Sequence, residues 1–319
     1  MGTLHTLLLL AALFPARPDS LPHQARALRV TVLSTMLADH TGIGEWGFGA
    51  LVEVDGRRIL FDTGERPETV LQNARELGID LSTITDVVLS HHHGDHAGGL
   101  LTLRKALAKQ NPAALSRVHV AEGIFLDRTA PDGSPPRTSM TEIRAAYEAS
   151  GGKFVVHSRP EEILPGVWVS GPVPRPYPER NWPHAARLKT AQGMVEDSIP
   201  EDMSLYIDTP QGLVVITGCG HAGTINTVQH ARAVVRKAPA YGLIGGLHLF
   251  ASTDRDVEWT ATKLKEFGLA HLIGAHCTGI EAVYRIREIA GLDRKTAVVG
   301  AVGSSFSLDG GIDPLDLAR

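Results

Sequence analysis

Four side chains of metal-binding type stand close together in the first half of the chain. They are His91, His93, Asp95 and His96. The group follows the apolar run 87–89, which predicts a buried strand ending just before it. Residues two apart on an extended chain point to the same side, so His91 and His93 can approach one cation while His92 points away. This spacing predicts a first metal site.

The rest of the pattern predicts a second metal site beside the first. Gly94 permits a sharp turn, after which Asp95 and His96 can bind another cation before a helix begins near Ala97. Imidazole and carboxylate donors suit Zn, and also Fe or Mn. A surface histidine run is the alternative, but unpaired polar groups between an apolar strand and an apolar helix are unfavourable. We therefore expect two divalent metal ions, with Zn favoured.

This pattern and five further stretches together resemble the metallo-β-lactamase superfamily, whose members are mostly binuclear hydrolases. The stretches are 45–47 (Glu-Trp-Gly), 61–64 (Phe-Asp-Thr-Gly), 217–223 (Thr-Gly-Cys-Gly-His-Ala-Gly), 245–249 (Gly-Gly-Leu-His-Leu) and 276–279 (His-Cys-Thr-Gly). They are similar to the branch named after 7,8-dihydropterin-6-yl-methyl-4-(β-D-ribofuranosyl)aminobenzene 5′-phosphate synthase. The resemblance runs from about Val30 to Gly303. Two positions depart from the branch, because His92 replaces its usual glycine and Gly94 a frequent tyrosine.

The remaining metal ligands are expected from the second half of the chain. His221 follows an apolar strand within a glycine-rich turn, and His276 matches the last histidine of the superfamily. Cys219 stands where many superfamily members carry a bridging aspartate, so its thiolate either binds metal or packs beside His221. His248 is open between a metal ligand, a proton donor to the leaving group and a core histidine.

Asp62 is predicted to support the site without binding metal. It ends a strand beneath the metal loop, where its carboxylate can hold a ligand imidazole or the loop backbone in place. Helix capping fits this residue less well, because the next helix begins several residues later.

The expected reaction is metal-assisted hydrolysis of a small-molecule ester, amide or phosphoester. In this mechanism a metal-bridged hydroxide attacks, Asp95 binds metal and orients it, and His248 protonates the leaving group. The branch name implies an alternative, a dihydropterin-type transferase in which an arylamine attacks a pterin pyrophosphate. A second alternative is a metal-bound binding protein without turnover. The ligand set alone does not separate hydrolysis from transfer.

The elements that must position these residues fall into two similar halves. The first has a hairpin over 48–62 turning at Asp55-Gly56, a helix over 67–77, and a helix from Ala97 whose leucines share one face. The second has a hairpin over 203–217, then βα units whose strands end near His248 and His276. Such alternation predicts an α/β fold, and the resemblance implies a four-layer αββα sandwich of two mixed β-sheets with outer helices.

The halves are joined by a stretch, about 125–200, that we predict to be an irregular insert in one domain spanning 28–319. Its segment 171–183 holds five prolines and predicts an ordered loop. Arg180, Trp182 and His184 in or beside this loop are the predicted substrate-binding residues, since aromatic and cationic side chains can grip a planar or anionic substrate.

Composition agrees with an enzyme for small molecules. The chain has 319 residues, 43% of them hydrophobic, and a net charge of −4, which gives no electrostatic case for nucleic acid or an anionic membrane. Residues 1–27 are predicted to be a non-folded leader or a signal peptide, with Thr6 to Phe14 as its apolar segment and Ala25-Arg26-Ala27 as a cleavage site. No Lys or Arg precedes that segment, and the candidate cleavage site lies well beyond its end, so a cytoplasmic location is slightly favoured over export. Cys277 is expected to be a small buried side chain.

Overall fold

Two large β-sheets form the centre of the fold. The computed structural model describes residues 23–130, 132–136, 138–182, 185–191 and 193–318. The first sheet has eight strands, in the spatial order β18 (Gly311–Asp313), β17 (Ser305–Ser307), β1 (Leu28–Ser34), β2 (Gly49–Val54), β3 (Arg57–Phe61), β4 (Asp86–Val88), β5 (Arg117–Ala121) and β7 (Lys153–His157). The strands from β3 to β7 run parallel, so their carboxyl ends meet at one edge.

The second sheet has seven strands. Their order is β16 (Ala297–Val299), β15 (His271–Gly274), β14 (Ala240–Gly245), β13 (Gly212–Thr217), β12 (Leu205–Thr209), β9 (Val167–Val169) and β8 (Glu161–Leu164). The four strands from β13 to β16 run parallel, which again collects several strand ends at one edge.

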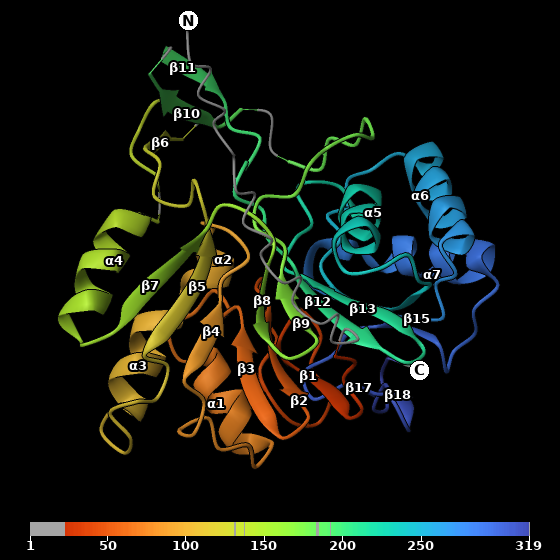
Figure 1. Ribbon diagram of the computed structural model, residues 1–319, viewed down its shortest axis with the longest axis horizontal. Coiled ribbons are helices and arrows are strands. Elements are labelled where there is room, and N and C mark those ends of the chain that lie inside the picture. Colours follow the sequence, from red (N-terminus) through yellow and green to blue (C-terminus); the bar gives the residue numbers. More distant parts are fainter. Residues whose placement is uncertain (1–22, 131, 137, 183–184, 192, 319) are drawn as a thin grey trace, which may run out of the picture.

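Helices cover the outer face of each sheet, as Figure 1 shows. They are α1 (Thr69–Glu76), α2 (Gly94–Ala97), α3 (Leu100–Leu107) and α4 (Met140–Ala149) beside the first sheet, and α5 (Thr224–Val234), α6 (Asp254–Glu266), the 3-10 turn η1 (His276–Thr278) and α7 (Ile280–Ala290) beside the second. One apolar core lies between the two sheets. A second lies between the first sheet and its helices, and a third between the second sheet and its helices. These layers confirm the predicted αββα sandwich.

Local sequence signals account for several of these elements. At the turn between β2 and β3, Asp55 and Gly56 both adopt positive φ, of 47° and 78°, as a tight hairpin with this twist requires. The apolar face predicted after Ala97 is present in α3, where Leu100, Leu103 and Leu107 are buried. Burial of such a stripe against the sheet, rather than helix propensity, holds an eight-residue helix in place.

The stretch 125–200 is more regular than predicted. It contains β7, β8 and β9, which join the two large sheets, and a small third sheet of β6 (Arg128–Thr129), β10 (Arg187–Thr190) and β11 (Gly193–Glu196) that lies above the strand ends (Figure 1). These strands have two to five residues, too few to show a clear periodicity. β7 and β9 pair with the distant strands β5 and β12, whereas β8 with β9 and β10 with β11 form short local hairpins.

The chain packs onto the fold shortly before β1. Ala25 is buried and its N–H donates to the carbonyl of Asp208 at 2.8 Å, while the N–H groups of Arg26 and Ala27 donate to Asp55 at 3.0 and 2.8 Å. The apolar segment predicted at 6–14 lies outside the described residues. Among the described helices, none has the length and hydropathy needed to cross a membrane.

Candidate metal centre

Most of the predicted site residues follow the carboxyl end of a strand. Asp62 follows β3, the segment 91–96 follows β4, Cys219 and His221 follow β13, and His276 follows β15. Because parallel strands end at a common edge in each sheet, and the two sheets pack face to face, side chains from both halves meet at one point.

The first group of donors combines residues of both halves. His91, Cys219 and His221 offer ligand atoms that lie within 4.8 Å of one another, and all three are buried. His93 joins them, because its Nδ1 lies 2.9 Å from Nε2 of His91. His221 Nε2 is buried and has no hydrogen-bond partner among the described residues. Of these residues, His91 and His93 are the pair expected from the sequence to bind a first cation.

The second group lies beside the first and shares its sulfur atom. His96, Cys219 and His276 offer atoms within 4.8 Å of one another, with His96 Nε2 3.1 Å from Cys219 Sγ. Asp95 Oδ2 lies 3.3 Å from His276 Nε2 and 3.8 Å from His96 Nε2. Both ring nitrogens of His276 are buried without a hydrogen bond to the described residues. Cys219 therefore stands between the two groups.

The outer nitrogens of three histidines contact oxygen acceptors, and this fixes which nitrogen faces the centre. Nδ1 of His96 donates to Asp62 at 2.7 Å, Nδ1 of His221 donates to the Asn181 carbonyl, and Nδ1 of His91 donates to Ser90 Oγ at 2.9 Å. The Nε2 lone pairs are then left pointing inward, as metal-ligating imidazoles require. His91 Nε2 and His93 Nδ1 lie 2.9 Å apart. Two lone pairs would repel at this distance, so a cation or a proton must lie between the two nitrogens.

The protonation states also suit a cation. Burial lowers the pKa of His93 to about 3, and burial together with neighbouring histidines lowers the pKa values of His91 and His221 well below the usual range. For Asp95, burial acts to raise the pKa, but the charge of His96 and the contact with His276 outweigh it and hold the carboxyl ionised. Despite burial, neighbouring acidic groups raise the pKa of His96, and they raise that of His276 to about 10, so a cation would displace a proton from each of these two rings. Neutral imidazoles and an ionised carboxylate are the ligand forms of these side chains, and with those protons displaced the residues present fit a divalent metal ion.

Asp62 holds the metal loop as predicted from its position. One carboxylate oxygen accepts the Ser90 N–H at 2.7 Å, and the other accepts the Ser90 hydroxyl and His96 Nδ1, both at 2.7 Å. Gly218 lies against this group, because a Cβ at that position would stand 2.6 Å from Asp62 Oδ2. The carboxylate thus fixes the loop backbone and one ligand ring together.

We expect Asp62→Ala to weaken metal binding by about 10- to 100-fold, since it frees the His96 ring to rotate and leaves the buried Ser90 N–H unpaired. Competition with a fluorescent chelator measures this affinity. Asp80→Ala is the matched control, because Asp80 likewise accepts the N–H and hydroxyl of one serine, Ser82, at 2.8 and 3.0 Å, but is exposed and lies in the loop after α1. Equal metal affinity in both variants contradicts the role of Asp62.

Comparison with known proteins agrees with this geometry. A sequence model of the metallo-β-lactamase superfamily matches residues 49–178. A solved structure described as a metal-dependent hydrolase of the β-lactamase superfamily aligns with a TM-score of 0.70 at 26% identity, covering 92% of this chain and 100% of its own. The chain therefore resembles the metallo-β-lactamase superfamily in sequence and shares its fold. Proteins of this superfamily typically bind divalent metals, which agrees with the donor groups described above.

Two other known proteins are similar to this chain, one in sequence and one in fold. The 7,8-dihydropterin-6-methyl-4-(beta-D-ribofuranosyl)-aminobenzene-5'-phosphate synthase of Methanocaldococcus jannaschii is 29% identical over 261 residues, which cover 78% of this chain and 87% of the synthase. Zn(2+)-bound PqqB from Methylobacterium extorquens shares the fold, with a TM-score of 0.51 at 15% identity over 88% of this chain and 100% of its own. Superfamily and named relative together indicate an enzyme.

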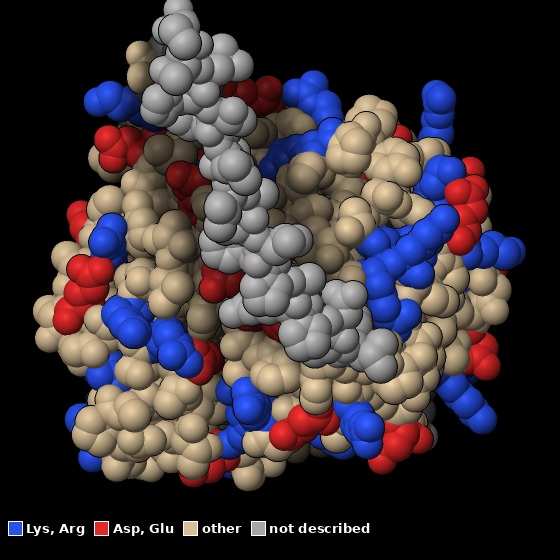
Figure 2. All heavy atoms as spheres, in the orientation of Figure 1, with Lys and Arg blue, Asp and Glu red and all other residues tan. Residues whose placement is uncertain are grey.

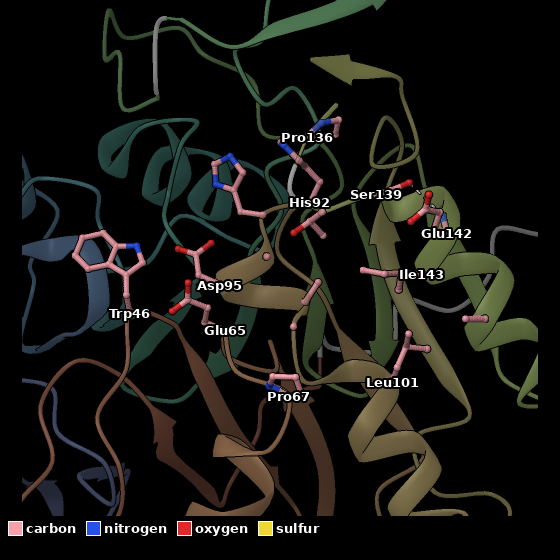
Figure 3. A pocket seen from close by; sticks show the side chains of 16 residues that line it. Trp46, Glu65, Pro67, His92, Asp95, Leu101, Pro136, Ser139, Glu142 and Ile143 are labelled. Carbon is pink, nitrogen blue, oxygen red and sulfur yellow. Dashed lines mark hydrogen bonds between the residues drawn. The ribbon is translucent and has the colours of Figure 1, made fainter. Parts of the chain in front are cut away.

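A groove opens beside Asp95 on the first half of this metallo-β-lactamase fold. Its volume is about 790 Å³, and its walls come from the metal loop, from Trp46 and from α4. Figure 3 shows Asp95 and Trp46 at one end and Glu142 and Ile143 of α4 at the other. The Trp46 ring also packs 5.1 Å from the His276 ring, measured between centroids. Trp46 was not predicted as a site residue, although its segment carried part of the family resemblance.

The predicted substrate loop, 171–183, contacts the metal centre through Asn181 and not through the residues predicted to bind substrate. Arg180 and Trp182 both contact the carboxylate of Glu196 in β11, at 3.1 and 3.0 Å, and neither is among the described residues that line the groove. His184 lies outside the described residues. Asn181 between them reaches the centre, because its carbonyl accepts the His221 proton and its side chain donates to the Leu247 carbonyl at 3.2 Å. A single asparagine in a loop gave no sequence signal for this role.

The same loop is fixed at the N-terminus of α5 by Glu179. Its carboxylate accepts the N–H groups of Ile225 and Asn226 at 3.0 and 2.9 Å, and burial raises its pKa to about 7, despite these donors. A carboxyl whose folded pKa lies above the usual value of about 4.5 stabilises the fold fully below pH 4.5 and loses that contribution as the pH rises through 7.

We therefore expect wild-type protein to lose thermal stability relative to Glu179→Gln between pH 5 and pH 8. Scanning fluorimetry at a series of pH values, on protein stripped with a chelator, gives the difference in Tm between the two. Stripping removes the pH dependence of metal binding from the comparison. A difference in Tm that is constant over this range contradicts the raised pKa.

Proposed function

We propose that this protein is a metal-dependent hydrolase of a small-molecule ester, amide or phosphoester, working with two divalent ions and with Zn favoured. One observation carries the proposal: two buried donor groups share Cys219 at the point where strand ends of both sheets meet, beside an open groove. The proposal places His91, His93 and His221 on one ion and Asp95, His96 and His276 on the other, with Cys219 between them. When bound, such ions polarise an electrophilic carbonyl or phosphoryl group and lower the pKa of water.

The residues of the chain itself divide the remaining work. Asp95 lies at the groove end of the centre, where its carboxylate can orient a water against the substrate and accept its proton (Figure 3). The Trp46 ring provides an apolar face at the same end of the groove. His248 is absent from the described residues that line the groove, so we do not assign it the proton transfer expected from the sequence.

The charge distribution supports a small molecule as the substrate. On the face shown in Figure 2, basic and acidic side chains are interspersed over the described surface, and the whole chain carries a net charge of −4. A protein that binds nucleic acid usually gathers its basic residues on one face. The proposal therefore includes neither a nucleic-acid partner nor a membrane.

A dihydropterin-type transferase is the second candidate, favoured by the 29% identity to the synthase over 78% of this chain. Hydrolysis and transfer differ in whether the groove admits water or an arylamine as nucleophile. Incubation with a pterin pyrophosphate, with and without an aminobenzoate analogue, separates them. A product that keeps the arylamine supports transfer, whereas release of the pterin alcohol at the same rate in both samples supports hydrolysis.

Metal content combined with turnover tests the proposal as a whole. Untagged protein, purified without chelators, is analysed by inductively coupled plasma mass spectrometry and then screened with ester, amide and phosphoester substrates. At least two equivalents of Zn, Fe or Mn per chain, with turnover lost on stripping and restored by that metal, is the expected result. Two bound ions without turnover on any substrate class favour a binding protein, and one ion or none after reconstitution contradicts the ligand assignment.

A further inference from the structure

A third group of donors lies on the far side of Cys219, and it contains two side chains that the proposed reaction does not use. Cys219, His248 and Cys277 offer ligand atoms within 4.8 Å of one another. Both cysteines are free and buried, and His248 is half-buried. We infer that these three residues form a third metal subsite, for a thiophilic cation such as Zn²⁺ or Cd²⁺.

The backbone of His248 has an unusual conformation, which places its imidazole beside the two cysteines. It has a φ of 50°, in the left-handed region that non-glycine residues rarely adopt, so the surrounding structure must impose the conformation. The chain is tied down on both sides of His248. Before it, the Leu247 N–H donates to Thr278 Oγ1 at 3.1 Å and the Gly246 N–H donates to the Gly218 carbonyl at 3.1 Å, and after it the Phe250 N–H donates to the Cys277 carbonyl at 3.3 Å. His248 Nδ1 is nevertheless buried without a hydrogen-bond partner among the described residues.

The Cys277 thiol packs closely against the loop that precedes His248. A Cβ on Gly246 would lie 2.8 Å from Cys277 Sγ and 2.2 Å from the Gly218 carbonyl oxygen, so only glycine lets the thiol stand this close to the loop. The hydrogen bond assigned to the thiol is weak, with Cys277 Sγ 4.0 Å from the Cys219 carbonyl oxygen.

The chemistry of the donors decides which cation fits. Two thiolates and one imidazole, with a fourth position left open, form a known zinc-binding set, and thiolates select soft cations over Mn²⁺ or Mg²⁺. The two donor groups of the proposed reaction each contain one sulfur atom, that of Cys219, which this group shares. Their other donors are nitrogen and oxygen atoms. Deprotonation of both thiols on binding would release two protons and balance the charge of a divalent ion.

Titration of the reduced, stripped protein with Cd²⁺ tests the subsite. Cadmium bound to thiolate absorbs in the ultraviolet, and mass spectrometry under native conditions counts the ions. We expect three equivalents in wild-type protein, two in Cys277→Ala and two in His248→Ala, with about half of the thiolate absorbance lost in Cys277→Ala. Titration with Mn²⁺ is expected to stop at two equivalents in all three proteins.

His230→Ala is the matched control, because His230 in α5 is also a half-buried histidine but hydrogen-bonds to the hydroxyl of Tyr206 in β12. It is expected to bind three Cd²⁺ as wild type does. The inference is overturned if wild-type protein binds no more Cd²⁺ than Cys277→Ala and His248→Ala do. It is also overturned if a thiol count on protein kept under reductant shows that Cys219 and Cys277 form a disulfide. If Cys277→Ala keeps two ions and its turnover, the proposed function still holds. The experiment therefore distinguishes failure of the third subsite from failure of the proposed function.

Discussion

Replacing Asp95 by asparagine is expected to lower kcat/KM of the metal-dependent reaction about a thousandfold, within the range by which a positioned acid–base group accelerates a reaction. The substitution keeps the shape of the side chain but removes its charge. Asp95 contacts His276 and His96 at 3.3 and 3.8 Å and also faces the groove, so the loss affects both the ligand set and the proton acceptor.

A matched carboxylate separates these effects from a general change in groove charge. Glu65 lines the same groove and is exposed, so Glu65→Gln is expected to change kcat/KM less than tenfold. Metal content of the Asp95 variant is measured alongside turnover at saturating metal. Wild-type kcat/KM in Asp95→Asn contradicts the role of Asp95, and an equal loss in Glu65→Gln would show that the groove potential, not the position of Asp95, controls the rate.

The sequence predicted the layers and the strand ends because these depend on local patterns. Apolar runs followed by polar, glycine-containing turns marked the ends of β4, β13 and β15, and the αββα architecture then required those ends to converge. The spacing in 91–96 also predicts that the His92 side chain points away from the cation, and in the structure its Nδ1 contacts Glu201 at 2.6 Å while its ring packs against that of His93, with 4.5 Å between centroids.

What could not be predicted depends on contacts between distant residues. His92 and Glu201 are 109 positions apart, and the Asn181 carbonyl meets a ring 40 positions further on. The sharing of Cys219 among three donor groups is a fact of three-dimensional packing, because Cys277 and His248 reach it from separate strand ends. The short strands β7 and β9 of 125–200 were missed for the same reason, since they are stabilised by their partners more than by their own sequence.

The contact between His92 and Glu201 belongs to a buried charged network beneath the metal loop. Glu201 is fully buried and accepts from His92 Nδ1 and from Arg128 Nη2, both at 2.6 Å. Arg128 Nε donates to Asp197 at 2.9 Å, and both of these side chains are also buried. The network joins β6 and the segment before β12 to the middle of the metal-binding pattern.

Glu201→Ala is expected to reduce the free energy of unfolding by about 3–5 kcal/mol, because removal of one partner leaves the buried Arg128 charge only partly compensated. Urea denaturation of the stripped protein, with an unchanged m-value, measures this loss. The double variant Glu201→Ala with Arg128→Met is expected to recover part of it, since the unpaired charge is then gone as well. Arg144→Met is the control: it breaks an exposed Arg144–Glu148 pair, with a 2.9 Å contact, and should change stability by less than about 1 kcal/mol.

The network also predicts an effect on the centre that simple destabilisation would not produce. His92 stands between two ligand residues, so loss of its Glu201 partner should let the segment 91–93 move and weaken metal binding even at temperatures where the variant is fully folded. We therefore expect Glu201→Ala to bind metal more weakly than a core variant such as Leu103→Ala, which removes a buried α3 side chain at an expected loss of about 2–5 kcal/mol. Equal metal affinity in these two variants at 10 °C would show that the network supports the fold alone.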